Sequence, residues 1–203
     1  MKDTYRCIES PTEESLYKEK GSKFYGYAFP VKSEEEVKFH LSELRKQHPT
    51  AGHFCFAWQM GEEKTRFRSS DDGEPNNSAG MPIYGQIQAF GLSNILVVSV
   101  RYFGGTKLGV GGLIQAYKTS AQYTLEGATI VERTIDDYYE LTFGYDLMNK
   151  VMQIVKEKKL IILQQDLTLN CVLRIAIRKG ETPSVVERFD QLYPLSIKKI
   201  ASA

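Results

Sequence analysis

The sequence predicts an α+β fold in two parts, because strand-like and helix-like patterns alternate along it. The glycine content falls and the order of the expected elements becomes regular late in the chain. Residues 95–102 form a continuous apolar run, which is typical of a strand buried on both faces. Only Gly144 and Gly180 follow Gly127, so glycine-rich turns are concentrated in the first part. The last third instead follows the order β-α-β-β-α-β. We therefore place a domain boundary between residues 136 and 137.

Local patterns predict a mixture of strands and helices in the first part. Ser33 is a favourable N-cap, and the three glutamates after it suit the positive end of a helix dipole. Asn77 or Ser78 is the expected N-cap of a helix that runs toward Phe90. The remaining expected elements are two strands with a turn in residues 16–31, helices 34–48 and 112–125, and strands 53–60 and 95–102.

The second part predicts a ferredoxin-like sandwich, in which two helices pack on one face of a sheet. Alternate residues from Cys171 to Ile177 are apolar, so they are expected on one buried face of a strand. Thr182 and Pro183 are expected to begin and cap the second helix of this part. The expected elements are strands 138–143, 161–167, 169–177 and 197–200 and helices 147–159 and 182–193.

The charge balance excludes several classes of protein. With 26 basic and 25 acidic residues, the formal net charge is +1, which argues against a histone-like protein and against an acidic disordered tail. The charge is also even along the chain: residues 1–136 have 16 basic and 17 acidic side chains, and residues 137–203 have 10 and 8. Any nucleic-acid surface would therefore be a local patch.

The cysteines indicate a reducing compartment, and the apolar runs indicate that no segment spans a membrane. Cys7, Cys55 and Cys171 lie far apart without a CxxC motif, so free thiols are expected rather than disulfides or zinc ligands. Cys55 lies between two phenylalanines and is expected to be buried rather than nucleophilic. No apolar run is long enough to span a bilayer, and no signal-peptide pattern opens the chain. The expected location is cytoplasmic, and no metal or cofactor is expected.

The densest motif is a glycine-rich loop between the apolar run and the next expected helix. Its sequence, Arg101-Tyr-Phe-Gly-Gly-Thr-Lys-Leu-Gly-Val-Gly-Gly112, combines cations with glycines that allow close backbone approach. Unpaired amides at a helix start bind anions, so the loop predicts a phosphate or RNA-backbone site. The spacing fits neither a P-loop nor a dinucleotide motif, and the alternative is a crowded crossover in which the glycines only relieve steric contact. The candidate residues are Arg101, Gly104, Gly105, Lys107, Gly109, Gly111 and Gly112.

A second candidate is the acidic segment that contains Asp71, Asp72 and Glu74. Three carboxylates so close together could hold Mg²⁺ or serve in acid–base catalysis. A turn also explains them, because Asp and Gly are common turn and cap residues. We expect Arg101 to pair with a carboxylate such as Asp72. His53, which opens an expected strand, is a further candidate.

Two long motifs and the strand that His53 opens stand in order in the first part. The motifs are Ser70-Asp-Asp-Gly-Glu-Pro75 with Ser78-Ala-Gly-Met-Pro82, and Val100-Arg-Tyr-Phe-Gly-Gly105 with Leu108-Gly-Val-Gly-Gly-Leu113. Together they resemble the IMPACT (YigZ-type) protein family over residues 21–128. The chain departs from that family at Asn76-Asn77-Ser78, where many relatives have Gly-Thr, and at Gln115, where an arginine is expected.

The resemblance implies that the first part is like the second domain of ribosomal protein S5 and that a ferredoxin-like domain follows it. It also implies a role in translation, because eukaryotic members of the family bind proteins that control the translation-initiation stress kinase. It carries no catalytic residue onto this chain.

The sequence therefore favours a non-enzymatic, translation-associated regulator or binding protein. Its partner would be RNA, the ribosome or a translation factor, contacted through the glycine-rich loop. Because non-specific affinity for RNA grows with the number of phosphates neutralised, the near-neutral net charge argues for a shape-specific contact of modest affinity. The alternative is an enzyme that acts on a phosphorylated small molecule, with Asp71, Asp72 and Glu74 as metal or acid–base groups. That alternative requires the carboxylates to converge beside the loop in a concave pocket.

Overall fold

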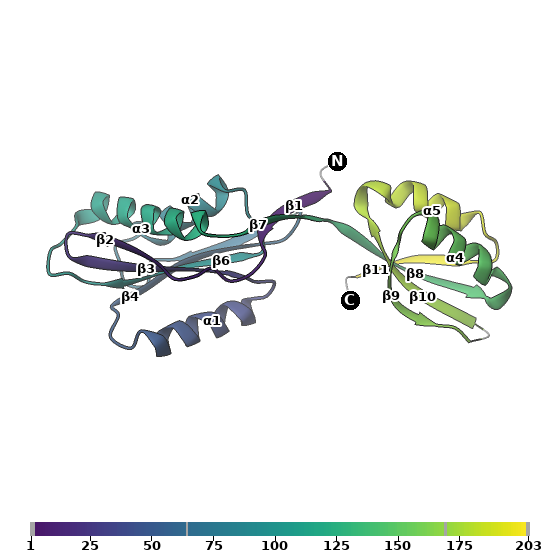
Figure 1. The fold of residues 1–203 in the computed structure, drawn as a ribbon, viewed down its shortest axis with the longest axis horizontal. Helices are drawn as coiled ribbons and strands as arrows, with labels where there is room; N and C mark the ends of the chain where they lie inside the picture. Colours follow the sequence, from purple (N-terminus) through teal and green to yellow (C-terminus); the bar gives the residue numbers. More distant parts are fainter. Residues whose placement is uncertain (1–2, 64, 169, 202–203) are drawn as a thin grey trace. The chain divides into compact units, whose positions relative to one another are not determined.

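A computed structural model describes residues 3–63, 65–168 and 170–201 of the protein. The chain folds into two compact units, one formed by residues 5–133 and the other by residues from Thr134 onward together with Asp3 and Thr4 (Figure 1). Both units contain strands and helices, so the predicted α+β class is confirmed. In the described parts of the chain, no helix is both long enough and apolar enough to cross a membrane.

The first unit is an antiparallel sheet with helices on both of its faces (Figure 1). Its strands are β2 (Ser15–Glu19), β3 (Ser22–Pro30), β4 (His53–Met60), β5 (Arg66–Ser70) and β6 (Ile95–Tyr102). Its helices are α1 (Glu34–Gln47), α2 (Gly80–Ala89) and α3 (Gly109–Glu126). The strand order is β2-β3-β6-β4-β5, with α1 on one face and α2 and α3 on the other. Strands β1 (Thr4–Ile8) and β7 (Ile130–Thr134) pair in a separate sheet.

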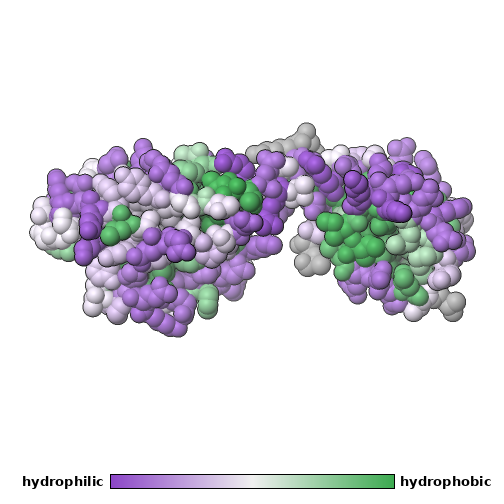
Figure 2. Space-filling model, viewed as in Figure 1, coloured by the Kyte–Doolittle hydropathy of each residue, from purple (hydrophilic) through white to green (hydrophobic). Residues whose placement is uncertain are grey.

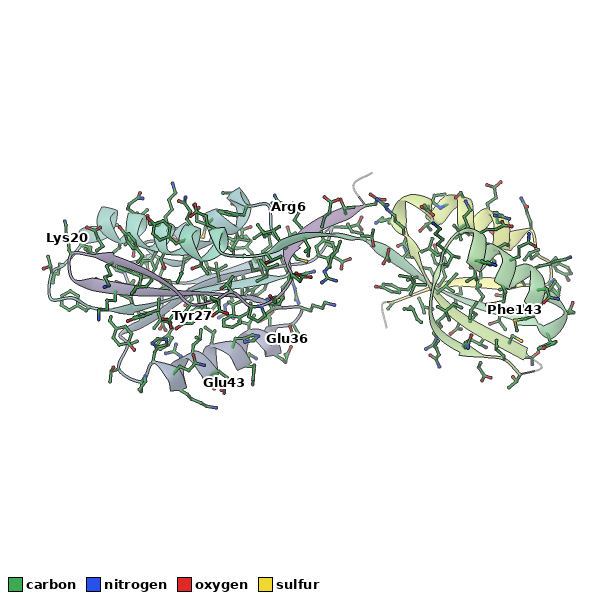
Figure 3. All side chains as sticks on the ribbon, in the orientation of Figure 1. Arg6, Lys20, Tyr27, Glu36, Glu43 and Phe143 are labelled. Carbon is green, nitrogen blue, oxygen red and sulfur yellow. The ribbon has the colours of Figure 1, made fainter. Side chains whose placement is uncertain are left out.

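Strand β6 lies at the centre of this sheet and is buried on both faces, as its apolar run predicted. Ile95 and Val97 belong to the core beneath α2 and α3, whereas Leu96 and Val98 belong to the core beneath α1. Side chains fill the space on both sides of the sheet (Figure 3). Because β6 runs from this double core into the glycine-rich loop, its penultimate residue, Arg101, is also buried.

The helices of the first unit begin close to the predicted positions. Ser33 caps α1, and its hydroxyl oxygen accepts a hydrogen bond from the Glu36 amide at 3.2 Å. Helix α3 begins at Gly109, one turn earlier than the predicted start at Gly112, so the last glycines of the motif form its first turn. Gly109 has a φ of +71°, which glycine adopts without strain. The spacing of the apolar residues does not reveal this backbone geometry, so it did not predict that the helix begins at Gly109.

The second unit follows the predicted order β-α-β-β-α-β. Its elements are β8 (Asp136–Gly144), α4 (Met148–Glu157), β9 (Ile161–Asp166), β10 (Asn170–Arg178), α5 (Thr182–Asp190) and β11 (Ser196–Ile200), with 3₁₀ turns at Tyr145–Leu147 and Lys179–Glu181. The antiparallel sheet has the order β11-β8-β10-β9. Alternate residues from Cys171 to Ile177 are buried, as predicted, and belong to one core with Val151 of α4 and Phe189 of α5. Leu169, where the predicted strand begins, lies outside the described residues.

Thr182 differs from its predicted role as a helix cap. It is the first residue of α5, and its hydroxyl donates to Asp137 at 2.9 Å instead of accepting a bond from a helix amide. Pro183 lies in the first turn, as expected.

Hydrophilic residues dominate the visible face of the first unit, and a hydrophobic area is visible on the second unit (Figure 2). Exposed apolar residues of the second unit include Ile161 and Leu163 of β9. The glycine-rich loop between β6 and α3 belongs to the first unit, and the candidate site is found there.

Candidate anion-binding site

The acidic segment folds as a turn between β5 and α2, and Asp71 serves as the cap of α2. Its carboxylate accepts hydrogen bonds from the amides of Asn77 at 2.8 Å, Ala79 at 3.0 Å and Gly80 at 2.8 Å. The prediction that Asn77 or Ser78 caps this helix is therefore wrong. The Ser78 hydroxyl donates instead to the Pro75 carbonyl oxygen at 2.6 Å. The turn brings the Asp71 side chain back to the helix start, where a negative charge is favourable.

Asp72 joins the same turn to β4 and α1. Its Oδ2 accepts a hydrogen bond from the Phe54 amide at 2.7 Å, and Arg45 Nη2 lies 3.1 Å from Oδ1. Asp72 is therefore not the carboxylate that pairs with Arg101. The reason is local: both oxygens of the Asp72 carboxylate are already engaged, one by the Phe54 amide and the other by Arg45.

Glu74 is the acidic residue that pairs with Arg101. Its Oε1 lies 2.5 Å from Arg101 Nη1 and accepts a hydrogen bond from the Tyr117 hydroxyl at 2.7 Å. His53 Nε2 lies 3.9 Å from the same oxygen, and His53 Nδ1 donates to the Asp72 carbonyl oxygen at 2.9 Å. Burial raises the pKa of Tyr117, so its hydroxyl stays protonated as a donor. The arrangement is a buried cluster of acid, guanidinium and phenol.

The three carboxylates consequently have three different sets of partners and do not converge. Among residues 3–63, 65–168 and 170–201, no group of three His, Cys, Asp or Glu side chains is placed to hold a metal ion. Cys55 is fully buried, and its thiol donates to the Asp71 carbonyl oxygen at 3.0 Å. Burial raises the pKa of this thiol, which keeps it protonated at neutral pH.

The first half of the glycine-rich loop is closed against the turn between β2 and β3. The Gly104 amide donates to Ser22 Oγ at 3.2 Å, and Arg101 Nη2 donates to the same oxygen at 3.3 Å. A Cβ atom on Gly104 would lie 1.8 Å from the Gly21 carbonyl carbon, so only glycine fits there. For Gly104, relief of steric contact explains the glycine.

The second half of the loop leaves the start of α3 open. Among the residues that the structure describes, no side chain caps this helix at Leu108, and its first turn contains no acidic residue. The first turn consists of Gly109, Val110, Gly111 and Gly112, and Lys107 precedes it as an exposed cation. The free amides of an 18-residue helix and an adjacent ammonium group both favour an anion.

A pocket of about 310 Å³ lies between the buried cluster and this helix start. Glu74 and Arg101 line it together with the apolar side chains of Phe103, Leu108 and Val110. Arg101 Nε is a buried donor without a hydrogen-bond partner in the described structure. Of the seven residues that the sequence predicted for this loop, three line the pocket, namely Arg101, Lys107 and Gly109. The other four, Gly104, Gly105, Gly111 and Gly112, do not line it.

Several residues of this region were not predicted as site residues, and three of them have clear roles. Tyr117 and Ser22 complete the hydrogen bonds of Glu74 and Arg101, and Phe103 lines the pocket. Tyr117 lies on the buried face of α3, at helical spacing from Leu113 and Ala121, and a buried tyrosine hydroxyl usually finds a partner. Asp71 and Asp72, in contrast, are structural residues of the turn and do not line the pocket.

The fold and the site define an α+β protein with a buried acid–guanidinium cluster beneath an uncapped, glycine-rich helix start. Such a site is suited to binding an anion. The family model described as the Impact N-terminal domain matches residues 20–125, so the chain belongs to the IMPACT family, as its motifs indicated. Its relatives bear out this membership over most of the chain.

The relatives include the IMPACT family member YvyE of Bacillus subtilis, which is 29% identical over 95% of this chain and 88% of its own length. The IMPACT family member YigZ of Escherichia coli is 32% identical over 70% of this chain and 71% of its own length. A solved structure described as a hypothetical protein is 26% identical, covers 100% of both chains and has a TM-score of 0.75.

Proposed function

We propose that the protein is a cytoplasmic, non-enzymatic binding protein of the translation apparatus that contacts RNA, alone or in the ribosome, through the start of α3. The observation that carries the proposal is the uncapped first turn of α3, with Lys107 beside it and a pocket beneath it. RNA phosphates are the anions that such a helix start and a lysine would meet in the translation apparatus.

The family and the fold support this proposal. The family resemblance implies a role in translation, and we assign residues 1–136 to a domain like the second domain of ribosomal protein S5. We assign residues 137–203 to a ferredoxin-like domain, because their sheet order, numbered within the unit, is 4-1-3-2. A translation-factor protein is the remaining candidate partner.

The arrangement of the carboxylates supports binding over catalysis. An enzyme that uses Asp71, Asp72 and Glu74 together needs them to converge beside the loop, whereas each has its own partners. The Glu74 charge is balanced by Arg101, and the anion-attracting groups that are left are Lys107 and the helix amides.

Binding of the full-length protein to ribosomes and to structured RNA over a series of salt concentrations tests the proposal. We expect binding that weakens with salt. Lys107→Ala should weaken it severalfold and reduce the slope of log affinity against log salt by about 0.7–0.9, because one phosphate contact is lost. Lys118→Ala is the matched control, since Lys118 is an exposed lysine further along α3. Binding that is absent, or that does not depend on salt, would contradict the proposal.

A further inference from the structure

We propose that the pocket between the buried cluster and α3 holds one nucleotide whose base carries an exocyclic amino group. This inference rests on the proposed function, because it names the ligand class of the same site. The phosphate would lie at the helix start and the base between the apolar walls, with its polar edge toward Glu74 and Arg101.

The phosphate position follows from the start of α3. In the described structure this helix has no side-chain cap and no acidic residue in its first turn, and an exposed lysine lies two residues before its first residue. Phosphate is the common biological anion that fits unpaired helix amides and a neighbouring ammonium group.

Arg101 gives a second, independent indication of a ligand. Its side chain is only 6% exposed, and its Nη atoms are paired with Glu74 and Ser22. Its Nε has no partner among the described residues, although buried donors in proteins are nearly always paired. Since Arg101 lines the pocket, an acceptor atom on a bound molecule can satisfy this donor.

Glu74 indicates which edge of a base the pocket favours. In the described part of the chain, the hydrogen bonds and ion pairs of its carboxylate are made by Oε1, and Oε2 accepts no hydrogen bond. Adenine, cytosine and guanine can donate an amino hydrogen to this oxygen, and a neighbouring ring nitrogen or carbonyl can accept from Arg101. Uracil can offer only its ring N3–H to this oxygen, and the two carbonyl oxygens that flank this hydrogen would lie close to the carboxylate and repel it. We therefore expect discrimination against uracil.

The walls of the pocket suit a flat ring. Phe103 is 57% exposed although it is a large apolar side chain, and it lines the pocket with Leu108 and Val110. Exposed aromatic side chains stack on unpaired bases. The volume of about 310 Å³ is at the small end of the range for small-molecule sites, so one nucleotide fits and a base-paired duplex does not.

Calorimetric titration of the full-length protein tests the inference with AMP, CMP, GMP, UMP, adenosine and inorganic phosphate as probes. We expect AMP, CMP and GMP to bind about tenfold more tightly than UMP, and AMP to bind more tightly than adenosine or phosphate. Phe103→Ala should weaken AMP binding about tenfold through loss of stacking. Phe39→Ala is the matched control, because Phe39 is a similarly exposed phenylalanine on α1.

A single-stranded oligoadenylate distinguishes the two sources of the nucleotide. If it displaces AMP, the pocket takes an unpaired nucleotide of RNA; if AMP binds and RNA does not, the pocket takes a free nucleotide, so the inference stands and the proposed function fails. Salt-dependent RNA binding without measurable binding of any mononucleotide would overturn the inference alone. Equal affinity for AMP and UMP, or no effect of Phe103→Ala on AMP binding, would also overturn it.

Discussion

Glu74 and Arg101 form an ion pair with almost no solvent around it, since their side chains are 5% and 6% exposed. Placing either charge alone in a protein interior costs several kcal/mol, and the attraction between partners offsets this cost only when the geometry is good. Here the pair is close, and the Tyr117 hydroxyl adds a hydrogen bond to the same carboxylate oxygen. The two charges are therefore stable as a unit, and the loss of either should be severe.

We expect Arg101→Met to lower the free energy of unfolding by about 3–5 kcal/mol, because Glu74 would become an uncompensated buried charge. The matched control is Arg45→Met, which breaks the more exposed pair with Asp72 and should cost about 1 kcal/mol or less. Urea unfolding followed by the fluorescence of Trp58 measures both variants. Equal losses would contradict the view that the Glu74–Arg101 pair differs from a surface pair.

The sequence could predict that Arg101 has a carboxylate partner but not which one. The candidate acids Asp71, Asp72 and Glu74 are so close together that pattern alone does not separate them. In the structure, Asp72 has a φ of +40° and Gly73 a φ of +90°, and these consecutive left-handed residues turn the chain sharply. Asp72 and Glu74 consequently face different elements. This choice depends on the tertiary contacts of the turn rather than on local propensity.

The start of helix α2 also depends on a contact that the preceding turn makes, rather than on the residues next to the helix. Its N-cap residue, Ala79, has no polar side chain, and the acceptor for its first amides comes from Asp71 earlier in the turn. Capping by a residue that is not adjacent satisfies the amides as well as an ordinary N-cap does. The turn and the helix are therefore one structural unit, held together by a single carboxylate.

We expect Asp71→Ala to lower the free energy of unfolding by about 2 kcal/mol, the upper end of the range for N-caps, because three amides lose their acceptor. Asp71→Asn should recover part of this loss, since it keeps a neutral acceptor. Asn77→Gly should change the free energy by about 0.5 kcal/mol or less, because φ at Asn77 is +60° and glycine adopts that angle freely. Chemical denaturation measures all three variants. A larger loss in Asn77→Gly than in Asp71→Ala would support the cap that the sequence pattern predicted.

Elements with a strong internal pattern could be predicted, whereas those defined by a partner strand could not. The apolar run of β6 and the capped, amphipathic α1 were recognised from their own residues. Strands β1, β5 and β7 were not, because they are short and partly polar and become strands through pairing. The β5 segment, Arg66–Ser70, has no buried residue. Its hydrogen bonds to β4 set it in place, and these are not visible in the sequence.

At the scale of the whole molecule, each unit has its own hydrophobic core. Two clusters lie on the two faces of the sheet in the first unit, and one lies between the helices and the sheet of the second. The only tryptophan, Trp58, is buried in the first unit. Phe189 is fully buried in the second unit. These positions make it possible to observe the two units separately.

We expect Phe189→Ala to destabilise the second unit by about 3–5 kcal/mol, because it leaves a cavity in that core. If residues 1–136 and 137–203 are separate domains, the urea midpoint from Trp58 fluorescence should stay unchanged, while far-ultraviolet circular dichroism should show an earlier transition. Leu125→Ala, a fully buried substitution in the first unit, is the reciprocal control and should shift the Trp58 midpoint. A common shift of both signals in Phe189→Ala would mean that the chain unfolds as one cooperative domain. Salt-dependent RNA binding that survives in Phe189→Ala, under conditions where the second unit is already unfolded, would place the binding site in the first unit alone.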